Sequence, residues 1–294
     1  MLSIYFFYLL IFTFGIVLGS FLNLVSDRIL TDEPIFSGRS HCDYCKKPLK
    51  AKNLFPLFSF LLQRGKSACC AEKLSLWYPV SELLTGAAVL FAGYASKVVS
   101  SFSFPNALAF CYLAFVFCVF VVLFIIDAKH HVLPDKIVLL AILITAIFIV
   151  LLSYFDLKNY YDKLSADTLG RYLIQAGFWN QHLTLVFKRV LLIFTSSFFI
   201  ALFFVALILL TKGRGMGGGD VKLGFLIGLF NGFPGNILAV FLGFLLGSIY
   251  SVVLMSFGKK KMKDTIAFGP FLIIGSLVAF IWGELLVNWY IRLF

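Results

Sequence analysis

The chain has 294 residues, of which 61% are hydrophobic and only 13% charged, and its formal net charge is +11. This composition excludes a soluble globular domain and indicates an integral membrane protein. The basic residues lie beside apolar segments, so they predict membrane topology and contact with anionic lipid headgroups. They give no reason to expect nucleic acid as a partner.

The apolar runs predict eight transmembrane helices, because a span needs roughly 20 apolar residues. The run over residues 223–258 is too long for one helix, and its Asn231-Gly-Phe-Pro-Gly-Asn236 segment predicts a tight reversal inside it. The runs are continuous and do not alternate, which excludes a membrane β-barrel. The runs occupy residues 2–26, 79–96, 98–126, 137–155, 190–211, 223–258 and 265–283.

The predicted fold class is an all-α polytopic membrane protein with a small loop domain between its first two helices. The predicted domains are a first transmembrane helix at 1–26, a cysteine-bearing loop domain at 27–78 and a membrane core at 79–294. The first helix has no basic start and no small-residue cleavage site, so we expect it to stay in the mature protein. Three small-x3-small patterns, at Gly15, Gly224 and Gly243, predict close helix packing.

Basic residues in the connecting segments predict the orientation of the chain. The segment 27–79 holds nine basic and five acidic residues, the segment 259–263 is almost purely basic, and Lys212 and Arg214 flank a glycine loop. All three segments face the cytoplasm if the N-terminus lies outside. The segment 153–189 then faces outward as a long loop. It carries no catalytic motif, and its aromatic residues fit the membrane interface.

Four cysteines, Cys42, Cys45, Cys69 and Cys70, lie in the predicted cytoplasmic segment. A reducing compartment disfavours disulfides there and favours a metal site. Cys42 and Cys45 have the two-residue spacing that lets two thiolates reach one tetrahedral zinc ion. Cys69 and Cys70 form a weaker second half, because adjacent side chains point apart unless the backbone kinks. Spacing alone leaves both zinc binding and unligated thiols open.

Two aspartates stand at the cytoplasmic ends of predicted spans. Asp127 follows the apolar run that ends at Ile126, and Asp220 ends the glycine loop 213–219. Ionisable groups at membrane depth are costly and are therefore functional candidates. Two partly desolvated carboxylates close together cannot both ionise easily, so one keeps a proton while the other takes one from water. This arrangement is typical of an aspartic peptidase, and the alternative is that both residues merely cap helices.

The chain resembles the prepilin peptidases, also called type IV leader peptidases, in several blocks that follow the family's order. Gly217-Gly-Gly-Asp220 fits the G-x-G-D motif of membrane aspartic peptidases, and the late P-A-L motif of the presenilin-like branch is absent from the sequence. The other blocks are GIVLGSFLNLVSDRI at 15–29, HCDYCKKPL at 41–49, LWYPVSELLTG at 76–86, IIDAKHHVLPDKI at 125–137 and FGPFL at 268–272.

The resemblance implies that Asp127 and Asp220 are the catalytic pair. It also implies that Gly217 and Gly219 shape the loop, where the lack of a Cβ lets the backbone approach a substrate closely. Lys222 is a candidate contact for substrate or headgroups, or an interfacial lysine that snorkels. Asp135, in the same block, is a second candidate for the site or a cap on the next helix.

The cysteine segment departs from the family pattern of two C-x2-C pairs. Ser67 stands where the third cysteine is expected, and three cysteines stay in register: Cys42, Cys45 and Cys70. A fourth zinc ligand would have to be the displaced Cys69 or His41. The resemblance therefore leaves the zinc site retained, weakened or lost.

The resemblance implies removal of the basic leader from type IV prepilins or type II pseudopilins, at the cytoplasmic face of a bacterial inner membrane. Peptide cleavage needs no cofactor, whereas a second activity, N-methylation of the new N-terminus, needs S-adenosylmethionine and is associated with the cysteine-bearing loop. A competing hypothesis is a polytopic transporter in which the paired aspartates bind a proton or cation. A third is a scaffold of a pilus or secretion machine that has lost activity.

Overall fold

The computed structural model describes residues 2–30, 33–34, 40–42, 44–50, 53–213, 216–258 and 266–292. These residues contain ten α-helices, and the only β-structure among them is two isolated bridges. The helices are α1 (Leu2–Leu30), α2 (Phe58–Leu62), α3 (Trp77–Ala95), α4 (Phe104–His130), α5 (Asp135–Ala166), α6 (Thr168–Gln175), α7 (Phe178–Leu210), α8 (Gly218–Asn231), α9 (Gly235–Ser256) and α10 (Gly269–Ile291).

The predicted all-α membrane fold is confirmed, but the count of eight spans is not. Among the described residues, six helices are long and apolar enough to cross a membrane: α1, α4, α5, α7, α9 and α10. Helix α8 has 14 residues, which gives about 21 Å against a hydrocarbon core of about 30 Å. Helix α3 has 19 residues, and Ser81 and Glu82 reduce its apolar character. These two spans stay predictions.

The chain groups into two compact units, residues 1–126 and 127–294. The predicted boundaries at 26/27 and 78/79 both fall inside the first unit, so the three-part division stays a prediction. Arg214 and the basic segment 259–263, which support the predicted orientation, lie outside the described residues.

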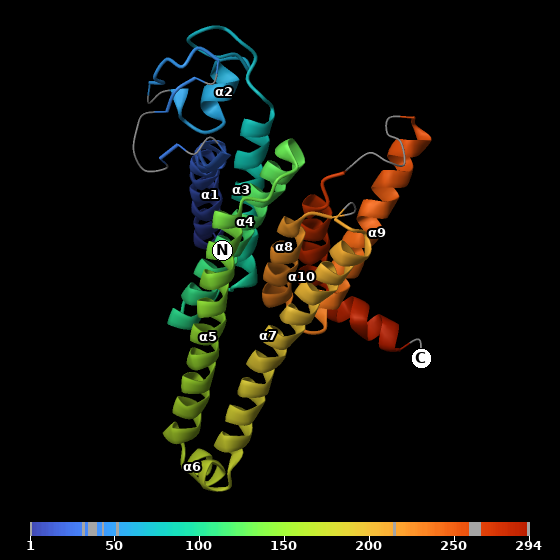
Figure 1. Ribbon diagram of the computed structural model, residues 1–294. Helices are drawn as coiled ribbons and strands as arrows, with labels where there is room; N and C mark the ends of the chain where they lie inside the picture. The colour runs from blue at the N-terminus through green and yellow to red at the C-terminus, as the bar shows by residue number, and fades with distance from the viewer. Residues whose placement is uncertain are drawn as a thin grey trace. The chain divides into compact units, whose positions relative to one another are not determined.

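Unit 1 is built on the pairing of α1 with α3, which lie side by side (Figure 1). Two glycines on α1 permit the close approach. A Cβ on Gly15 would lie 2.9 Å from the Cα of Gly86, and one on Gly19 would lie 2.8 Å from the Cα of Glu82. The predicted packing role of this small-x3-small pattern therefore agrees with the structure. The segment between the two helices carries α2 and both isolated bridges.

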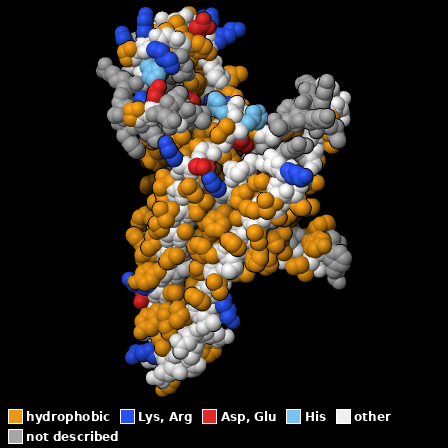
Figure 2. All heavy atoms as spheres, in the orientation of Figure 1, with side chains coloured by type: hydrophobic (Ala, Val, Ile, Leu, Met, Phe, Trp, Pro, Cys, Tyr) orange, Lys and Arg blue, Asp and Glu red, His pale blue; other side chains and the backbone are white. Residues whose placement is uncertain are grey.

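In unit 2, α8 packs against α5 and α7, and α9 pairs with α10 (Figure 1). The Asn231–Asn236 reversal forms as predicted, since α8 ends at Asn231 and α9 begins at Gly235. Hydrophobic side chains cover most of the visible surface of α5 and α7, as expected for helices that face lipid (Figure 2).

The segment 153–189, expected to be an outward loop, is instead almost entirely helical. Helix α5 continues to Ala166, α6 makes the turn, and α7 begins at Phe178 (Figure 1). Aromatic contacts join the two long helices here: the Tyr160 ring stacks on His182 at 3.9 Å between centroids, and Tyr161 meets Trp179 edge-on. The 32 residues of α5 extend over about 48 Å, so this hairpin exceeds the thickness of a bilayer core.

Candidate active site and cysteine cluster

Asp127 lies in the last turn of α4 and is only 5% exposed. Its Oδ2 accepts a hydrogen bond of 2.9 Å from the backbone N–H of Gly269. Gly269 is the first residue of α10, so its N–H has no acceptor within the helix and is free to donate outward. A Cβ at this position would lie 2.5 Å from the same oxygen. Glycine is therefore required for Asp127 to sit against the start of α10.

Asp220 lies in the first turn of α8 and is 9% exposed. Its Oδ2 accepts the backbone N–H of Gly217 at 3.2 Å, while its own N–H donates to the Gly217 carbonyl at 3.1 Å. This reciprocal pair closes the start of the helix, so the capping role considered for Asp220 is present, although the residue lies inside α8 and does not precede it.

The two carboxyl groups interact electrostatically within unit 2. Burial raises the pKa of Asp220 to about 6; the N–H of Gly217 opposes this increase, and the negative charge of Asp127 adds to it. Asp220 lies in the first turn of α8, which is not one of the six helices long and apolar enough to cross a membrane. Two neighbouring, buried carboxyl groups can share one proton, which is the arrangement needed for general acid–base chemistry on a water molecule.

The glycines of the G-x-G-D segment differ in their surroundings. A Cβ on Gly219 would lie 2.9 Å from the Cβ of Leu133, so Gly219 lets the two segments meet. Gly217 and Gly218 have open space around them. The function of Gly217 in the structure is its N–H bond to Asp220, a contact that any residue except proline could supply.

Lys222 and Asp135 form an ion pair of 2.6 Å between the start of α8 and the start of α5. Asp135 lies in the first turn of α5 after the N-cap residue Pro134, so it is not the predicted helix cap. Lys222 points to this acid, a partner that sequence reasoning did not propose. Both side chains are partly exposed, which makes the pair an edge of the site and not its centre.

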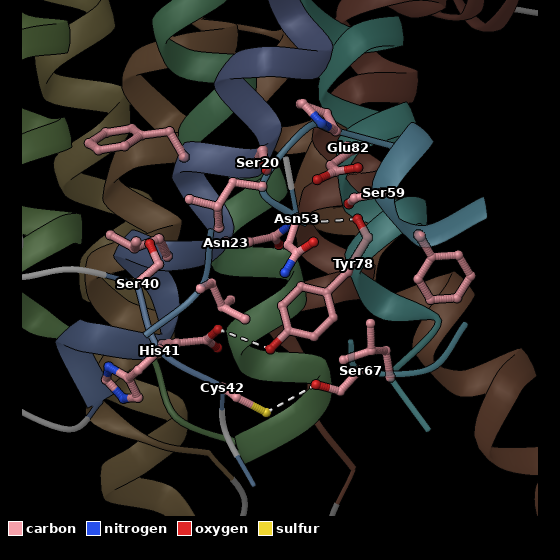
Figure 3. Close-up of a pocket in the computed structure, with 18 of the residues that line it drawn as sticks. Ser20, Asn23, Ser40, His41, Cys42, Asn53, Ser59, Ser67, Tyr78 and Glu82 are labelled. Carbon is pink, nitrogen blue, oxygen red and sulfur yellow. Dashed lines mark hydrogen bonds between the residues drawn. The ribbon is translucent and has the colours of Figure 1, made fainter. Parts of the chain in front are cut away.

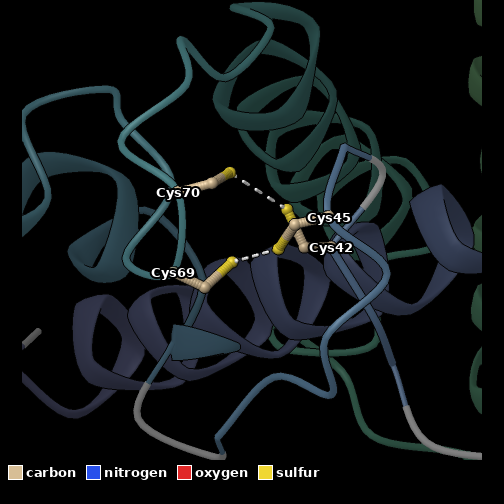
Figure 4. A group of neighbouring side chains, drawn as sticks. All are labelled: Cys42, Cys45, Cys69 and Cys70. Atoms are coloured by element: carbon tan, nitrogen blue, oxygen red, sulfur yellow. Dashed lines mark hydrogen bonds between the residues drawn. The ribbon is translucent and has the colours of Figure 1, made fainter.

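The four cysteines of unit 1 form one cluster, with Cys42 and Cys45 facing Cys69 and Cys70 (Figure 4). All four sulfur atoms lie within 4.8 Å of one another, with Cys42–Cys70 at 3.8 Å and Cys45–Cys69 at 3.0 Å. Zinc–sulfur bonds of about 2.3 Å place tetrahedral sulfurs a little under 4 Å apart, so this arrangement fits one tetrahedral ion. Cys69 and Cys70 lie in a turn that the Ala71 N–H closes by donating to the Ser67 carbonyl at 2.8 Å, and Ala71 itself has a φ of 60°. The cluster does not include His41.

The electrostatics of the cluster also suit a cation. Burial acts to raise the pKa of Cys42, but the N–H groups of Cys45 and Tyr44 and the hydroxyl of Ser67 outweigh it and lower that pKa to about 6. The bond with Cys69 raises the pKa of Cys45 to about 11. Metal ligation requires thiolates and would release the remaining protons. Ser67 takes no ligand position; its Oγ lies 3.2 Å from the sulfurs of Cys42 and Cys69 and can bond to either.

Two related family models match the chain. The bacterial peptidase A24 N-terminal domain matches residues 13–96, and the type IV leader peptidase family matches residues 114–252. The chain belongs to the type IV leader peptidase family. The matched regions contain the cysteine cluster and both aspartates, respectively.

Relatives of this family member carry the name prepilin leader peptidase/N-methyltransferase. The chain is 28% identical to one from Bacillus subtilis, with 97% of this chain and 98% of the relative covered. It is 28% identical to one from Legionella pneumophila, with 98% and 95% covered, and 27% identical to one from Aeromonas hydrophila, with 97% and 94% covered. No solved structure matches the chain.

Sequence reasoning missed two features of this leader peptidase homologue. The N–H of Gly269 that holds Asp127 belongs to the FGPFL block. The family resemblance includes this block but does not imply a contact for it. The second is a buried carboxylate, Glu82, in the LWYPVSELLTG block of unit 1. An acid within an otherwise apolar helix was the available signal for it.

Proposed function

We propose that this protein is a membrane aspartic endopeptidase that removes the basic leader from type IV prepilins or type II pseudopilins and then methylates the new N-terminus. The observation that carries the proposal is the pair of buried, interacting carboxyl groups, each held by a glycine N–H, in a chain of the type IV leader peptidase family. The family assignment favours a peptidase over the competing transporter.

In the proposed cleavage, Asp127 and Asp220 share a single proton. The ionised member takes a proton from water, the water oxygen attacks the scissile carbonyl carbon, and the protonated member donates to the carbonyl oxygen. Collapse of the tetrahedral species returns a proton to the leaving amine. The N–H groups of Gly269 and Gly217 orient the two carboxylates, and no metal takes part.

The membrane arrangement supports a substrate that is itself partly in the bilayer. Six helices in the described part of the chain are long and apolar enough to cross a membrane. We place the pair at the cytoplasmic face of the bacterial inner membrane from the basic residues of the sequence. A prepilin whose apolar segment lies beside these helices presents its leader at that face. A soluble leader peptide should therefore be cut more slowly than the intact prepilin.

Zinc and S-adenosylmethionine belong to the methyl-transfer half of the proposal. Cys42, Cys45, Cys69 and Cys70 would hold a structural zinc ion that ties the loop between α1 and α3 together, because a loop with little apolar core depends on such ligation. S-adenosylmethionine would supply the methyl group.

The decisive experiment is incubation of the purified protein with a prepilin in detergent, with leader loss and methyl addition read by mass spectrometry. Asp127→Asn and Asp220→Asn should each reduce cleavage by at least about a thousandfold while the protein still inserts, since neither acid works alone. Asp162→Asn, on the exposed face of the α5 extension, is the matched control and should cleave normally. Full cleavage by either active-site variant removes that residue from the catalytic role.

A further inference from the structure

Unit 1 contains a cavity of about 420 Å³ that cleavage does not use (Figure 3). Its walls come from α1, from the cysteine-bearing segment and from the start of α3. The volume falls in the range of small-molecule sites, which are typically about 300–1,000 Å³. The cavity lies within one compact unit, so its shape depends only on residues of that unit.

Glu82 is the most unusual group in the cavity wall. It is 7% exposed on an apolar helix, its Oε2 accepts the backbone N–H of Leu57 at 2.8 Å, and Ser20 donates a further hydrogen bond to the carboxylate. Among the described residues, no lysine or arginine forms an ion pair with it. A buried carboxylate held by two neutral donors and facing a cavity is suited to a cationic ligand.

The rest of the wall is divided between polar and apolar groups. Phe21, Phe60 and Tyr78 offer flat apolar surface of the kind that a purine ring stacks on. Lys46, also on the wall, can meet a carboxylate. A ligand with a heteroaromatic ring, a central cation and a carboxylate would find a matching group for each part.

We propose that this cavity binds the methyl donor, a sulfonium nucleoside of the S-adenosylmethionine class, with the Glu82 carboxylate facing its positively charged sulfur. The inference rests on the methyl-transfer half of the proposed function. It assigns that activity to a site separate from the aspartate pair, and it makes Glu82 the group that distinguishes the charged donor from its neutral, demethylated product.

The methyl transfer needs no reactant besides the donor, the new N-terminus and water. The ammonium group of the new N-terminus first loses a proton to water. The amine nitrogen then bonds to the methyl carbon as the carbon–sulfur bond breaks, and the bonding pair stays on sulfur. Sulfur thereby becomes neutral, so the attraction to Glu82 is lost and the spent product binds more weakly than fresh donor.

The cysteine cluster has a structural part in this proposal because Cys42 belongs to both the cluster and the cavity wall, where it lies 3.2 Å from the hydroxyl of Ser67 (Figure 3). Zinc bound by the four thiolates would fix that wall. Replacing Cys45, whose sulfur is a cluster member but not a wall residue, should therefore weaken donor binding through the metal alone.

The test is calorimetric binding of S-adenosylmethionine and of S-adenosylhomocysteine to the purified, zinc-loaded protein in detergent. Wild-type protein should bind the charged donor about tenfold more tightly than the neutral product. Glu82→Gln keeps one acceptor oxygen for the Leu57 N–H, lets the Ser20 hydroxyl accept from the new amide, and removes the charge. It should therefore weaken donor binding about tenfold and product binding less than about twofold. Glu72→Gln makes the same charge change at an exposed site of the same loop and should change neither affinity.

Equal affinity of wild-type protein for donor and product overturns the proposal, and this comparison needs no variant. Undiminished donor binding by Glu82→Gln overturns it too, provided that the variant still cleaves prepilin and is therefore folded. Wild-type protein that cleaves prepilin but binds no donor refutes the inference and leaves the peptidase intact. Donor binding with the expected discrimination, but without cleavage, supports the cavity and refutes the peptidase.

Discussion

Gly269→Ala should slow cleavage although it replaces neither aspartate. The added Cβ would lie 2.5 Å from Asp127 Oδ2, whereas real Cβ contacts are essentially never shorter than 3.0 Å. The carboxylate or the start of α10 must then move by about 0.5 Å or more, which stretches the 2.9 Å hydrogen bond beyond about 3.2 Å, the normal limit.

The expected effect is on the rate of the chemical step. A displacement of this size in a positioned acid–base pair costs about 10- to 100-fold in rate, so kcat should fall by that factor. KM should change little, because the added Cβ displaces Asp127, whose proposed part is in the chemical step. The assay is the initial rate of leader removal from a prepilin in detergent, at several prepilin concentrations.

The same helix offers the control. A Cβ on Gly283 would meet nothing closer than Leu238 Cδ2 at 3.9 Å, so Gly283→Ala should cleave at the wild-type rate. It should also be slightly more stable, by about 0.5–1 kcal/mol, because alanine favours a helix interior. A Gly269→Ala protein that cleaves as fast as wild type would refute the idea that this contact sets the position of Asp127.

Three further outcomes follow from the described contacts. Gly219→Ala should lower cleavage, because its Cβ would lie 2.9 Å from the Leu133 Cβ, while Gly218→Ala has open space and should not; equal rates for the two variants contradict the argument. Asp135→Asn removes the ion pair with Lys222, and because both groups are partly exposed it should cost only about 0–1 kcal/mol of stability. A tenfold loss of cleavage in that variant would give Asp135 a part in catalysis. Chelation of the purified protein should suppress methyl transfer and spare leader removal, measured in one mass spectrum, and loss of both activities would argue against separate sites.

The sequence by itself determined the membrane class and the helices. A long apolar segment in a bilayer has no water to bond its backbone N–H and C=O groups, so it forms these hydrogen bonds within a helix. It also placed Asp127 and Asp220 at the ends of apolar runs, where a charge is costly enough to be noticed. The reversal at Asn231–Asn236 followed from proline and glycine. These features depend on local composition and on the solvent, so they can be predicted without knowledge of tertiary neighbours.

Local pattern was a poorer guide to the segment 153–189 and to the cysteines. The charged residues of that segment suggested a loop, yet contacts such as Tyr160 with His182 join α5 to α7, and both helices run on well past the apolar residues. Ser67 in place of a cysteine left the metal site open, and the structure shows that Cys69 and Cys70, in the turn between Ser67 and Ala71, both reach the same cluster.

Only the tertiary structure decided which groups hold the functional side chains. Asp127 is fixed by the Gly269 N–H, 142 residues away in sequence, and Glu82 by the N–H of Leu57 across a loop. Lys222 meets Asp135 because α8 packs on α5. A backbone N–H donor cannot be recognised from residue type, since every residue except proline carries one. Which acceptor such an N–H reaches is decided only when the tertiary structure brings helix ends together.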